Sequence, residues 1–418
     1  MTRPARKALI SGCGIAGPVV ALFLQRAGIE AEIYEARASS TDYGGNFLNM
    51  ACNGLGVLKP LGLDGPVSEQ GSPIPRMMMW SGKGKRLGEV PNGARAEVGT
   101  PSINILRSRL HQVLREGAEE QRIKIAYGKK LADLESDAQG VVATFADGTT
   151  TEGSFLVGCD GVHSRTRRLV NPDAPPPHYT SLIGTGGFAP HSSFAPTPDT
   201  MHFVFGKRAF FGYHISASGE LYWFANVLQR EPPSRGELDM IASEEWQERL
   251  LDLFREDMPR VSEMIRATES TIIGYPFYDI PTQPVWHKGR VVLVGDAIHA
   301  VSPSAGQGAS LAVEDAIVLA KCLRDIPDHA LAFATYERLR RARVERMVQH
   351  GRNAGQGKVM TNPIGVWLRD LSMPLIFKLL ANLANSAAGK WIYSYQVDWD
   401  EPVGDTTKAV EQGPWLAR

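Results

Sequence analysis

Residues 7–37 read KALISGCGIAGPVVALFLQRAGIEAEIYEAR, and this stretch decides the fold. A short apolar run enters the pattern Gly12-Cys-Gly14-Ile-Ala-Gly17, an apolar helix follows, and a second apolar run ends at Glu35. The first glycine allows a tight turn, the second lets the backbone approach a pyrophosphate, and the third lets the helix pack closely on the strand. Free N–H groups at the helix start then face the phosphates. The sequence therefore predicts a dinucleotide-binding unit.

The acid at the end of the second strand strengthens this prediction. Gly12 and Glu35 are 23 positions apart, which places the carboxylate to accept both ribose hydroxyls of an adenosine. The alternative is a glycine turn with a purely structural role, which would not require an acid at Glu35. We expect an α/β protein with a Rossmann-like domain, and the motif alone does not choose between NAD and FAD.

Composition narrows the class of partner. The chain has 418 residues, with 45 basic and 45 acidic side chains and no block of like charge, which argues against a nucleic-acid partner. Its four cysteines are scattered without metal-ligand spacing, as in a reducing compartment. We see no signal-peptide layout, and charged residues and a proline interrupt the apolar stretch at 363–385. We expect a cytoplasmic protein without a metal site or a membrane span.

Two later segments have the same layout of a buried strand running into a glycine–acid turn. In GSFLVGCDGVHSRTRRLV, residues 153–170, the strand ends at Asp160-Gly161, and the simplest interpretation leaves the following arginines solvated. In VVLVGDAIHAVSPSAGQGASLAVED, residues 291–315, the strand ends at Asp296 and a helix opens near Gly308. The apolar residues of that helix recur every three to four positions, as in a helix packed on a sheet.

In this order and at these distances, the three motifs resemble the class A flavoprotein monooxygenases. This family is typified by para-hydroxybenzoate hydroxylase and includes tetracycline-inactivating and urate-hydroxylating enzymes. The resemblance extends over roughly residues 7–375, and INILRSRLHQVL at 103–114 matches the RxxLxxxL segment of the family. It implies a Rossmann-like FAD-binding domain of the GR2 type, with FAD as the cofactor.

The resemblance also implies roles for individual residues. Arg107 would reach the flavin dinucleotide, Asp296 would bind the ribityl chain, and Gly306-Gln307-Gly308 would lie along the isoalloxazine. His299 would pack beneath the flavin without acting in catalysis, and no residue is assigned as catalytic because the flavin carries the chemistry. The full predicted cofactor set is Gly12, Gly14, Ile15, Ala16, Gly17, Glu35, Arg37, Arg107, Asp160, Gly161, Asp296, Gly306, Gln307 and Gly308.

Physical chemistry supports the glycine–glutamine–glycine turn independently. A reduced flavin carries negative charge near N1 and O2, which the N–H groups of a helix start stabilise. For Asp296 the alternative is a helix N-cap or turn residue. The chain departs from the family at Ala36, where an arginine often stands before the position of Arg37, and at Ile280, also often an arginine. Both departures concern nucleotide and NAD(P)H contacts.

The middle of the chain has a different pattern. Residues 179–275 contain short runs of period two, TMHFVFG, AFFGYHISASG and ELYWFANVLQ, which predict an antiparallel sheet. The resemblance makes this the substrate domain. Because both faces of the sheet are rich in aromatics, the substrate candidates could equally be sheet core. The four candidates are Arg208, Tyr213, Tyr222 and Phe224. Such a lining suits a flat organic substrate.

We expect both domains to be discontinuous in sequence. The FAD-binding domain comprises residues 1–72, 97–178 and 276–350, and the substrate domain, a mixed or antiparallel sheet, comprises 73–96 and 179–275. A C-terminal helical segment at 351–400 and a tail at 401–418 complete the chain. The charged helix around 336–355 is most simply a solvated face.

The predicted function is that of an FAD-dependent monooxygenase. With NADPH or NADH and O2, it would hydroxylate or epoxidise an aromatic or polyketide-like molecule through a flavin C4a-hydroperoxide. The alternatives are a flavin-dependent reductase or oxidase, a Baeyer–Villiger enzyme, and a non-catalytic flavin-binding accessory protein. A WxWxIP halogenase element is absent from the sequence. The substrate, the preferred nicotinamide and the choice between monomer and homodimer stay open.

Overall fold

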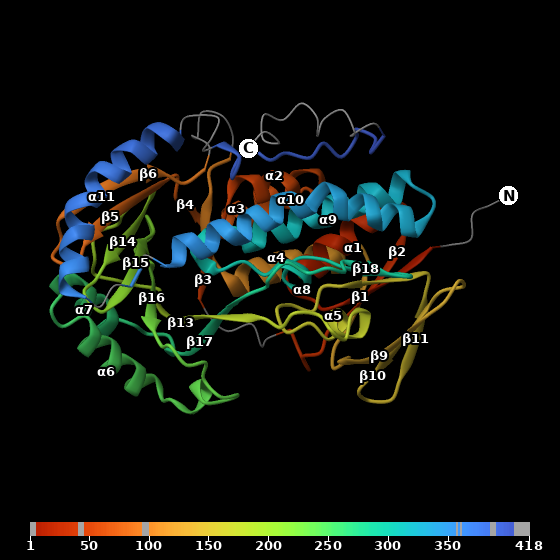
Figure 1. The fold of residues 1–418 in the computed structure, drawn as a ribbon, viewed down its shortest axis with the longest axis horizontal. Helices are drawn as coiled ribbons and strands as arrows, with labels where there is room; N and C mark the ends of the chain where they lie inside the picture. The colour runs from red at the N-terminus through yellow and green to blue at the C-terminus, as the bar shows by residue number, and fades with distance from the viewer. Residues whose placement is uncertain are drawn as a thin grey trace.

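The computed structural model describes residues 6–40, 46–93, 100–356, 358–359, 362–384 and 390–404. Figure 1 shows two parts side by side, one with long helices over a central sheet and one with a large sheet of its own. The predicted tail beyond residue 404 and the predicted domain boundary at residues 96 and 97 lie outside the described residues.

A six-stranded sheet forms the centre of the first part. Its strands, in order across the sheet, are β18 (His287–Lys288), β19 (Val291–Leu293), β12 (Phe155–Gly158), β1 (Lys7–Ser11), β2 (Glu30–Tyr34) and β8 (Lys124–Ala126). All pairs are parallel except β18–β19. The central strands are continuous apolar runs because a parallel sheet is covered on both faces. The fold is therefore of the predicted α/β class.

Helices pack against this sheet and against one another. The principal ones are α1 (Ala16–Arg26), α4 (Arg107–Glu120), α9 (Gly308–Asp325) and α10 (His329–Gln356). Shorter ones are α2 (Cys52–Leu58), α3 (Asp64–Glu69), α5 (Arg165–Val170) and α8 (Asp296–His299), and the 3-10 turns are η1 (Lys59–Leu61), η2 (Leu238–Met240) and η3 (Pro303–Ala305). Apolar residues of α1, α9 and α10 join those of the sheet in one large core.

Two small antiparallel sheets flank this core. One contains β11 (Thr150–Gly153), β10 (Val141–Phe145) and β9 (Leu131–Ser136), and the other contains β3 (Phe47–Met50), β7 (Ile103–Leu106) and β4 (Gly71–Pro73). A turn at Asp147-Gly148 joins β10 and β11, and Gly148 has the left-handed φ of +80° that such a turn favours in glycine.

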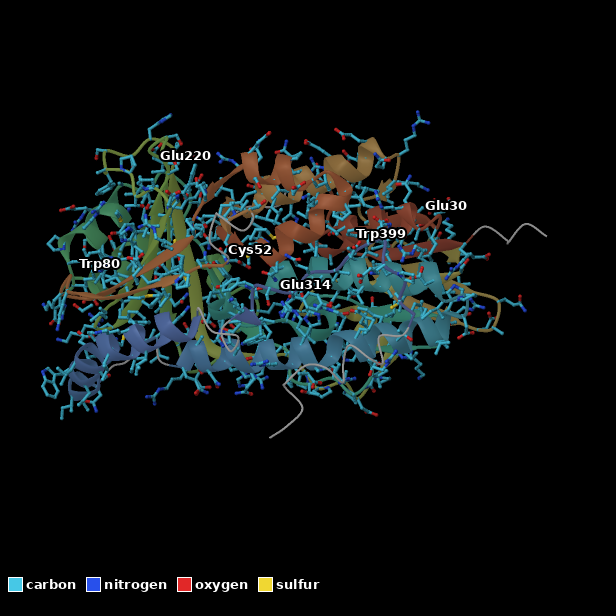
Figure 2. The ribbon with its side chains drawn as sticks, turned by 90° about the horizontal axis from the view of Figure 1, so that it is seen from above. Glu30, Cys52, Trp80, Glu220, Glu314 and Trp399 are labelled. Carbon is cyan, nitrogen blue, oxygen red and sulfur yellow. The ribbon has the colours of Figure 1, made fainter. Side chains whose placement is uncertain are left out.

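The second part is a seven-stranded sheet. Its order is β17 (Gly274–Asp279), β13 (His178–Ala189), β16 (Leu221–Leu228), β15 (Ala209–Ile215), β14 (Thr200–Phe205), β5 (Arg76–Ser81) and β6 (Arg86–Pro91). Every pair is antiparallel except β14–β5. The short segment carrying β5 and β6 thus joins the same sheet as residues 178–279. Helices α6 (Ser243–Leu253) and α7 (Pro259–Arg266) cover one face. Figure 2 places Trp80 and Glu220 in this part and Glu314 and Trp399 in the other.

The C-terminal third departs from one expectation. Helix α10 is not simply a solvated face, because Arg340 is fully buried and Tyr336 and Val344 belong to the core. After α11 (Pro363–Ala384), residues 390–404 run back over the first part, where Trp399 stacks on Phe23 of α1. Within the described ranges, none of the helices is long and apolar enough to cross a membrane.

Candidate functional site

Two glycines of the first turn are demanded by the fold itself. Gly12 has φ +105°, and a Cβ there would lie 2.5 Å from the carbonyl oxygen of Cys159. A Cβ on Gly17 would lie 2.0 Å from the carbonyl oxygen of Gly12. Both approaches are far inside contact distance, so these residues close the turn and seat α1 on the sheet.

Two other glycines are not explained by the protein alone. A Cβ on Gly14 would have His111 as its nearest neighbour, at 3.9 Å, and one on Gly308 would meet nothing within 4 Å. Neither has the left-handed φ that excludes side chains. Each therefore leaves open space beside a helix start, which is where a phosphate or another anionic group binds closely.

Glu35 is organised by the same turn. Its Oε2 accepts from the Cys13 N–H at 2.7 Å, and its Oε1 accepts from the Arg37 N–H at 2.9 Å. The carboxylate is buried at the end of β2. Since a carboxylate offers about four acceptor positions, these two contacts leave capacity for ribose hydroxyls.

Positive charge gathers next to this turn. Arg107 is the exposed first residue of α4, and its Nε lies 3.4 Å from His111 Nε2. Burial, and then the charges of Arg107, Arg37 and Arg115, lower the pKa of His111 to about 3. The imidazole is thus neutral while the arginines are charged, and the open space at Gly14 lies in their field. This setting suits a pyrophosphate.

The Asp160 carboxylate accepts hydrogen bonds from the protein itself. Its Oδ1 accepts from the Ser164 hydroxyl at 2.5 Å, and its Oδ2 accepts from the N–H and hydroxyl of Thr166 at 2.8 and 2.9 Å. These bonds order the start of α5 behind Gly161, whose φ is +78°. We expected the arginines that follow to be solvated, but Arg167 is buried.

Arg167 instead links two loops. Its guanidinium donates to the carbonyl of Val162 at 2.8 Å and to that of Ala297 in α8 at 2.7 Å. The two glycine–acid turns predicted from sequence are therefore joined through this side chain, which brings Asp160 and Asp296 to the same edge of the sheet.

Asp296 has an unusual environment. It is the first residue of α8, after Gly295 with φ +62°, and water reaches its side chain. Surrounding protein nevertheless raises its pKa by desolvation, while the charges of His299 and Arg107 act in the opposite direction. Within the described residues, its carboxyl has no hydrogen bond or ion pair. The carboxyl is thus free to bind hydroxyl groups of a ligand.

The glycine–glutamine–glycine turn also presents a free group. Gly306 adopts the left-handed conformation, and its carbonyl accepts from Asn49 Nδ2 at 3.1 Å. Gln307 is buried, and its Oε1 accepts from Asn53 Nδ2 at 3.0 Å. Its Nε2, however, has no hydrogen-bond partner in the part of the chain that the structure describes. A buried amide donor without a partner is costly, which indicates that a ligand supplies the acceptor.

Helix α9 begins directly after this turn and adds to its polarity. The helix runs for 18 residues from Gly308 and has no acidic residue in its first turn. The first N–H groups of such a helix have no intrahelical partner and carry partial positive charge. The turn can therefore stabilise negative charge that develops on a neighbouring group.

A buried network of ion pairs and hydrogen bonds supports the Gly295-Asp296 turn and, through Asn53, the turn at Gln307. Asp315 Oδ2 accepts from the Gly295 N–H at 3.0 Å and contacts His299 Nε2 at 2.5 Å, and its Oδ1 accepts from Arg340 Nε at 2.7 Å. Glu314 pairs with Arg340 at 2.8 Å and accepts from Asn53, the residue that holds Gln307. Burial alone would raise the pKa of Asp315, but His299 and Arg340 lower it overall.

Sequence reasoning missed this network. The signal available was the pair of adjacent acids within an otherwise apolar helix, at positions that α9 buries. Their partner, Arg340, was hidden because its helix is rich in charge on every side.

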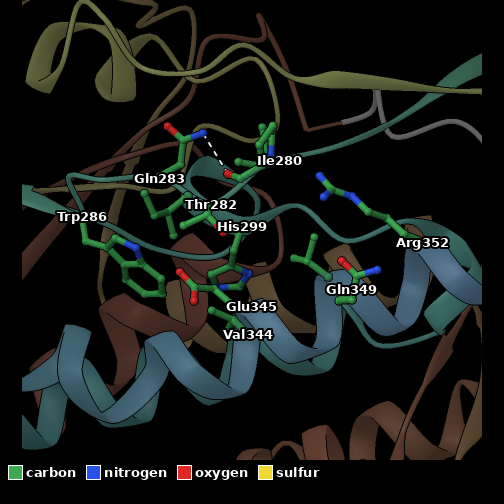
Figure 3. A pocket seen from close by; sticks show the side chains of 12 residues that line it. Ile280, Thr282, Gln283, Trp286, His299, Val344, Glu345, Gln349 and Arg352 are labelled. Carbon is green, nitrogen blue, oxygen red and sulfur yellow. Dashed lines mark hydrogen bonds between the residues drawn. The ribbon is translucent and has the colours of Figure 1, made fainter.

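His299 lies between the Asp315 network and a small cavity. It lines a cavity of about 60 Å³ between α8 and α10 (Figure 3). Other lining residues include Gln283, Trp286, Gln349 and Arg352. His299 Nδ1 has no partner in the described ranges, and the volume is sufficient for a few water molecules. Its ring thus spans from the Asp315 network to this cavity.

The four substrate candidates fall on different faces of the large sheet. Tyr213 packs beneath α6 and α7, stacked on His202 at 4.8 Å. Arg208 forms a surface ion pair with Asp252 at 2.7 Å. Tyr222 and Phe224 lie on the opposite face, which is the one turned toward the first part of the molecule. The structure therefore does not bring the four together.

Contacts connect that opposite face to the glycine–glutamine–glycine turn. Strand β3 carries Asn49, which binds Gly306, and two positions earlier Phe47. The Phe47 ring lies 5.8 Å from the rings of both Tyr222 and Phe224. We call Phe47, Phe203, Phe210, Tyr222 and Phe224 the aromatic face, since each lies within 6.2 Å of another.

Lys358 was not predicted, and it lies over this face. Its Nζ is 4.7 Å from the centre of the Phe210 ring. Burial lowers its pKa to about 8, with no contribution from a carboxylate among the described residues. Helix α10 ends two residues earlier beside η3, where a Cβ on Gly355 would lie 3.4 Å from Ser304 Oγ. Lys358 thus lies against the aromatic face, in the segment that follows the end of α10.

Comparison with known proteins adds three findings. The family described as FAD binding domain matches residues 6–351. Aurachin C monooxygenase/isomerase of Stigmatella aurantiaca is 30% identical over 88% of this chain and 94% of its own length, and 6-hydroxynicotinate 3-monooxygenase of Pseudomonas fluorescens is 29% identical over 83% and 90%. The crystal structure of a single-residue variant of Klebsiella pneumoniae HpxO with FAD has a TM-score of 0.78 and 25% identity, covering 90% of this chain and 98% of that one.

Proposed function

Because the chain belongs to the FAD binding domain family and is an FAD-dependent monooxygenase, we propose that it uses NADPH or NADH and O2 to oxygenate a flat aromatic substrate. The observation that carries this proposal is a convergence of unsatisfied groups. The free amide of Gln307 directly precedes the open start of α9, and Asp296 follows Gly295, which packs on Ala312 of the same helix. Strand β3 connects this turn to the aromatic face.

The residues present fit FAD. When bound, FAD supplies the redox chemistry, since it accepts electrons from a nicotinamide and passes them to O2. Arg107 and the glycine turn at Gly14 would hold the pyrophosphate, and Glu35 would accept from the adenosine ribose. Asp296 would accept from the ribityl hydroxyls. Gln307 Nε2 and the first N–H groups of α9 would donate to the oxygen and nitrogen atoms of the flavin ring.

The protein's contribution to the reaction is orientation, charge and exclusion of water. The N–H groups at the start of α9 favour the anionic, reduced form of the flavin. The aromatic face offers a dry surface on which a planar ring can stack. No side chain needs to act as a nucleophile, which agrees with the absence of a nucleophile–base pair in the residues described above.

Lys358 refines the substrate class. An ammonium group that is partly desolvated and has no carboxylate partner in the described chain gains most from an anionic ligand. We therefore propose an aromatic substrate that carries a carboxylate or an ionised hydroxyl. One relative is named for 6-hydroxynicotinate, an aromatic acid.

The first experiment is the absorption spectrum of the purified protein, followed by anaerobic reduction with NADPH or NADH in the presence and absence of single aromatic acids. We expect a two-band flavin spectrum that bleaches much faster with one compound, and a product one oxygen atom heavier after admission of O2. A colourless protein that cannot be loaded with FAD would contradict the proposal. Flavin reduction that no compound accelerates, with no oxygenated product, would favour the accessory role.

A further inference from the structure

Helix α11 carries an unusual amount of exposed apolar surface. Seven of its large apolar side chains are 45–67% exposed: Ile364, Trp367, Leu368, Leu371, Leu375, Ile376 and Leu379. Apart from Ile376, successive members recur at helical spacings that place them on one side of the helix. We call these seven residues the α11 stripe. Figure 1 shows α11 at the margin of the molecule, beyond β5 and β6.

The helix is nevertheless firmly attached by its other side. Phe377 packs so closely on β6 that a Cβ on Gly88 would lie 2.5 Å from its Cβ. The Arg369 guanidinium, which is buried, donates to the carbonyl of Phe205 at 2.9 Å. The inner side of α11 is therefore fixed to the substrate sheet, and the orientation that exposes the stripe is set by these contacts.

The stripe is too large for an ordinary monomer surface. A large apolar side chain exposes on the order of 200 Å² when free, so seven at these exposures present roughly 800 Å². The largest apolar patch on a typical monomer is about 300–600 Å². A standard protein–protein interface buries about 800 Å² on each partner. The stripe thus has the size that one side of a stable dimer needs.

Its chemistry favours protein over lipid as the covering partner. Helices that lie on membrane surfaces combine an apolar face with a polar face rich in Lys and Arg. The described side chains of α11 include only three charged ones, Arg369, Asp370 and Lys378, and Arg369 points inward. A helix that is apolar on nearly all sides is buried on nearly all sides.

We propose that the α11 stripe is the interface of a homodimer, in which the α11 helices of two copies of this chain pack against each other. The partner is therefore a second copy, and the contact is isologous, since each chain contributes the same stripe. With the twofold axis perpendicular to α11, the two helices run antiparallel. The stripe from Ile364 to Leu379 is about 22 Å long, and its midpoint is Leu371, which places Leu371 of each copy near the axis.

The test begins with the mass of the FAD-loaded protein in solution, measured by sedimentation at 1–100 µM. We expect twice the mass of one chain. The double variant Leu371→Asp, Leu375→Asp should sediment as one chain with an unchanged flavin spectrum. The control Leu331→Asp changes an equally exposed leucine on α10 and should stay dimeric. In Leu371→Cys, mild oxidation should produce a disulfide-linked dimer that the wild type does not form.

The wild-type measurement decides the proposal even if the variants fail to fold. A wild type with the mass of one chain at 100 µM overturns it. In that case, flotation of the monomer with phosphatidylcholine–phosphatidylglycerol vesicles would identify a membrane surface as the partner that covers the stripe. A wild-type dimer that survives the double substitution also overturns the proposal, because the interface would then lie elsewhere.

Discussion

The proposed flavin end of this molecule, which comprises the turns at Gly12–Gly17 and Gly306–Gly308 together with Asp296, differs from the seven-stranded sheet in how polar and charged side chains are satisfied. At the flavin end, Asp296 and Gln307 retain groups without protein partners within the described ranges, and Gly14 leaves space that no protein atom fills. On the seven-stranded sheet, Arg208 is paired with Asp252, and Tyr213 is stacked on His202 in the core. Thr185 Oγ1 and His214 Nε2 of the seven-stranded sheet also lack partners within the described ranges. Unmet bonding capacity therefore indicates a ligand only where it adjoins open space, as it does beside Gly308.

The first prediction concerns the support behind the flavin end. Arg340→Met removes a fully buried counter-charge shared by Glu314 and Asp315 and leaves them only Arg343 and His299 as cationic or imidazole partners. Removing one member of a buried ion pair costs about 3–5 kcal/mol, and we expect the free energy of unfolding, measured by urea denaturation, to fall by that amount. The matched control is Arg341→Met, whose partly exposed pairs with Glu337 and Glu345 are worth less than about 1 kcal/mol each. Equal losses would show that the network is not a support.

The second prediction tests whether the space at Gly14 is reserved for the ligand. Gly14→Ala introduces a methyl group that the protein alone can accommodate, so we expect an unchanged free energy of unfolding for the apoprotein. The affinity for FAD should fall about a hundredfold, because the backbone can no longer approach the pyrophosphate. Fluorescence titration with FAD measures this. Gly17→Ala should lose stability and FAD together, and the same result for Gly14→Ala would refute the distinction.

The third prediction extends the comparison to the aromatic face. If Lys358 binds an anionic substrate, the flavin-loaded enzyme should bind benzoate more tightly than benzamide, as detected by perturbation of the flavin spectrum. We expect Lys358→Met to weaken benzoate binding about tenfold and leave benzamide unaffected. Lys207→Met, which changes a surface lysine paired with Glu256, is the control.

The pH dependence of that binding follows from the pKa of Lys358. The ammonium is charged below a pKa of about 8 and neutral above it, so the preference for benzoate should be constant at lower pH and decline as pH rises through 8. Bound benzoate favours the charged form and moves this midpoint upward. A preference that is equal at pH 7 and pH 10 would mean that another group binds the anion.

The smallest effect on benzoate affinity is expected for Arg208, the substrate candidate that lies on the protein surface. Arg208→Met removes an exposed ion pair worth at most about 1 kcal/mol, and we expect less than a twofold change in benzoate affinity. A tenfold loss would show that the substrate contacts this side of the sheet and would overturn the assignment of Tyr222 and Phe224 to the substrate face.

The turns of the flavin end were predictable because local sequence encodes them. The glycine pattern at Gly12–Gly17, the acid at Glu35 and the helix start at Gly308 each depend on residues within one strand–turn–helix unit, and all lie where expected. The substrate face was harder to predict, because both sides of β15 and β16 are aromatic and period two gives no preference between them. Lys358 and Arg340 gain their settings only from tertiary contacts, which a linear pattern does not contain.

The order of strands in the central sheet has a consequence for how the protein is made. Strand β1 pairs with β12, and β12 pairs with β19, which begins at residue 291 of 418. Strand β19 begins 133 residues after β12 ends (291 − 158), so at typical rates of translation about 7–27 s separate the synthesis of the two strands. Until β19 is made, one edge of β12 has no partner strand, and the apolar core residues that β19 and α9 cover are exposed to solvent. We therefore expect the nascent chain to depend on chaperones, with FAD stabilising only the finished protein.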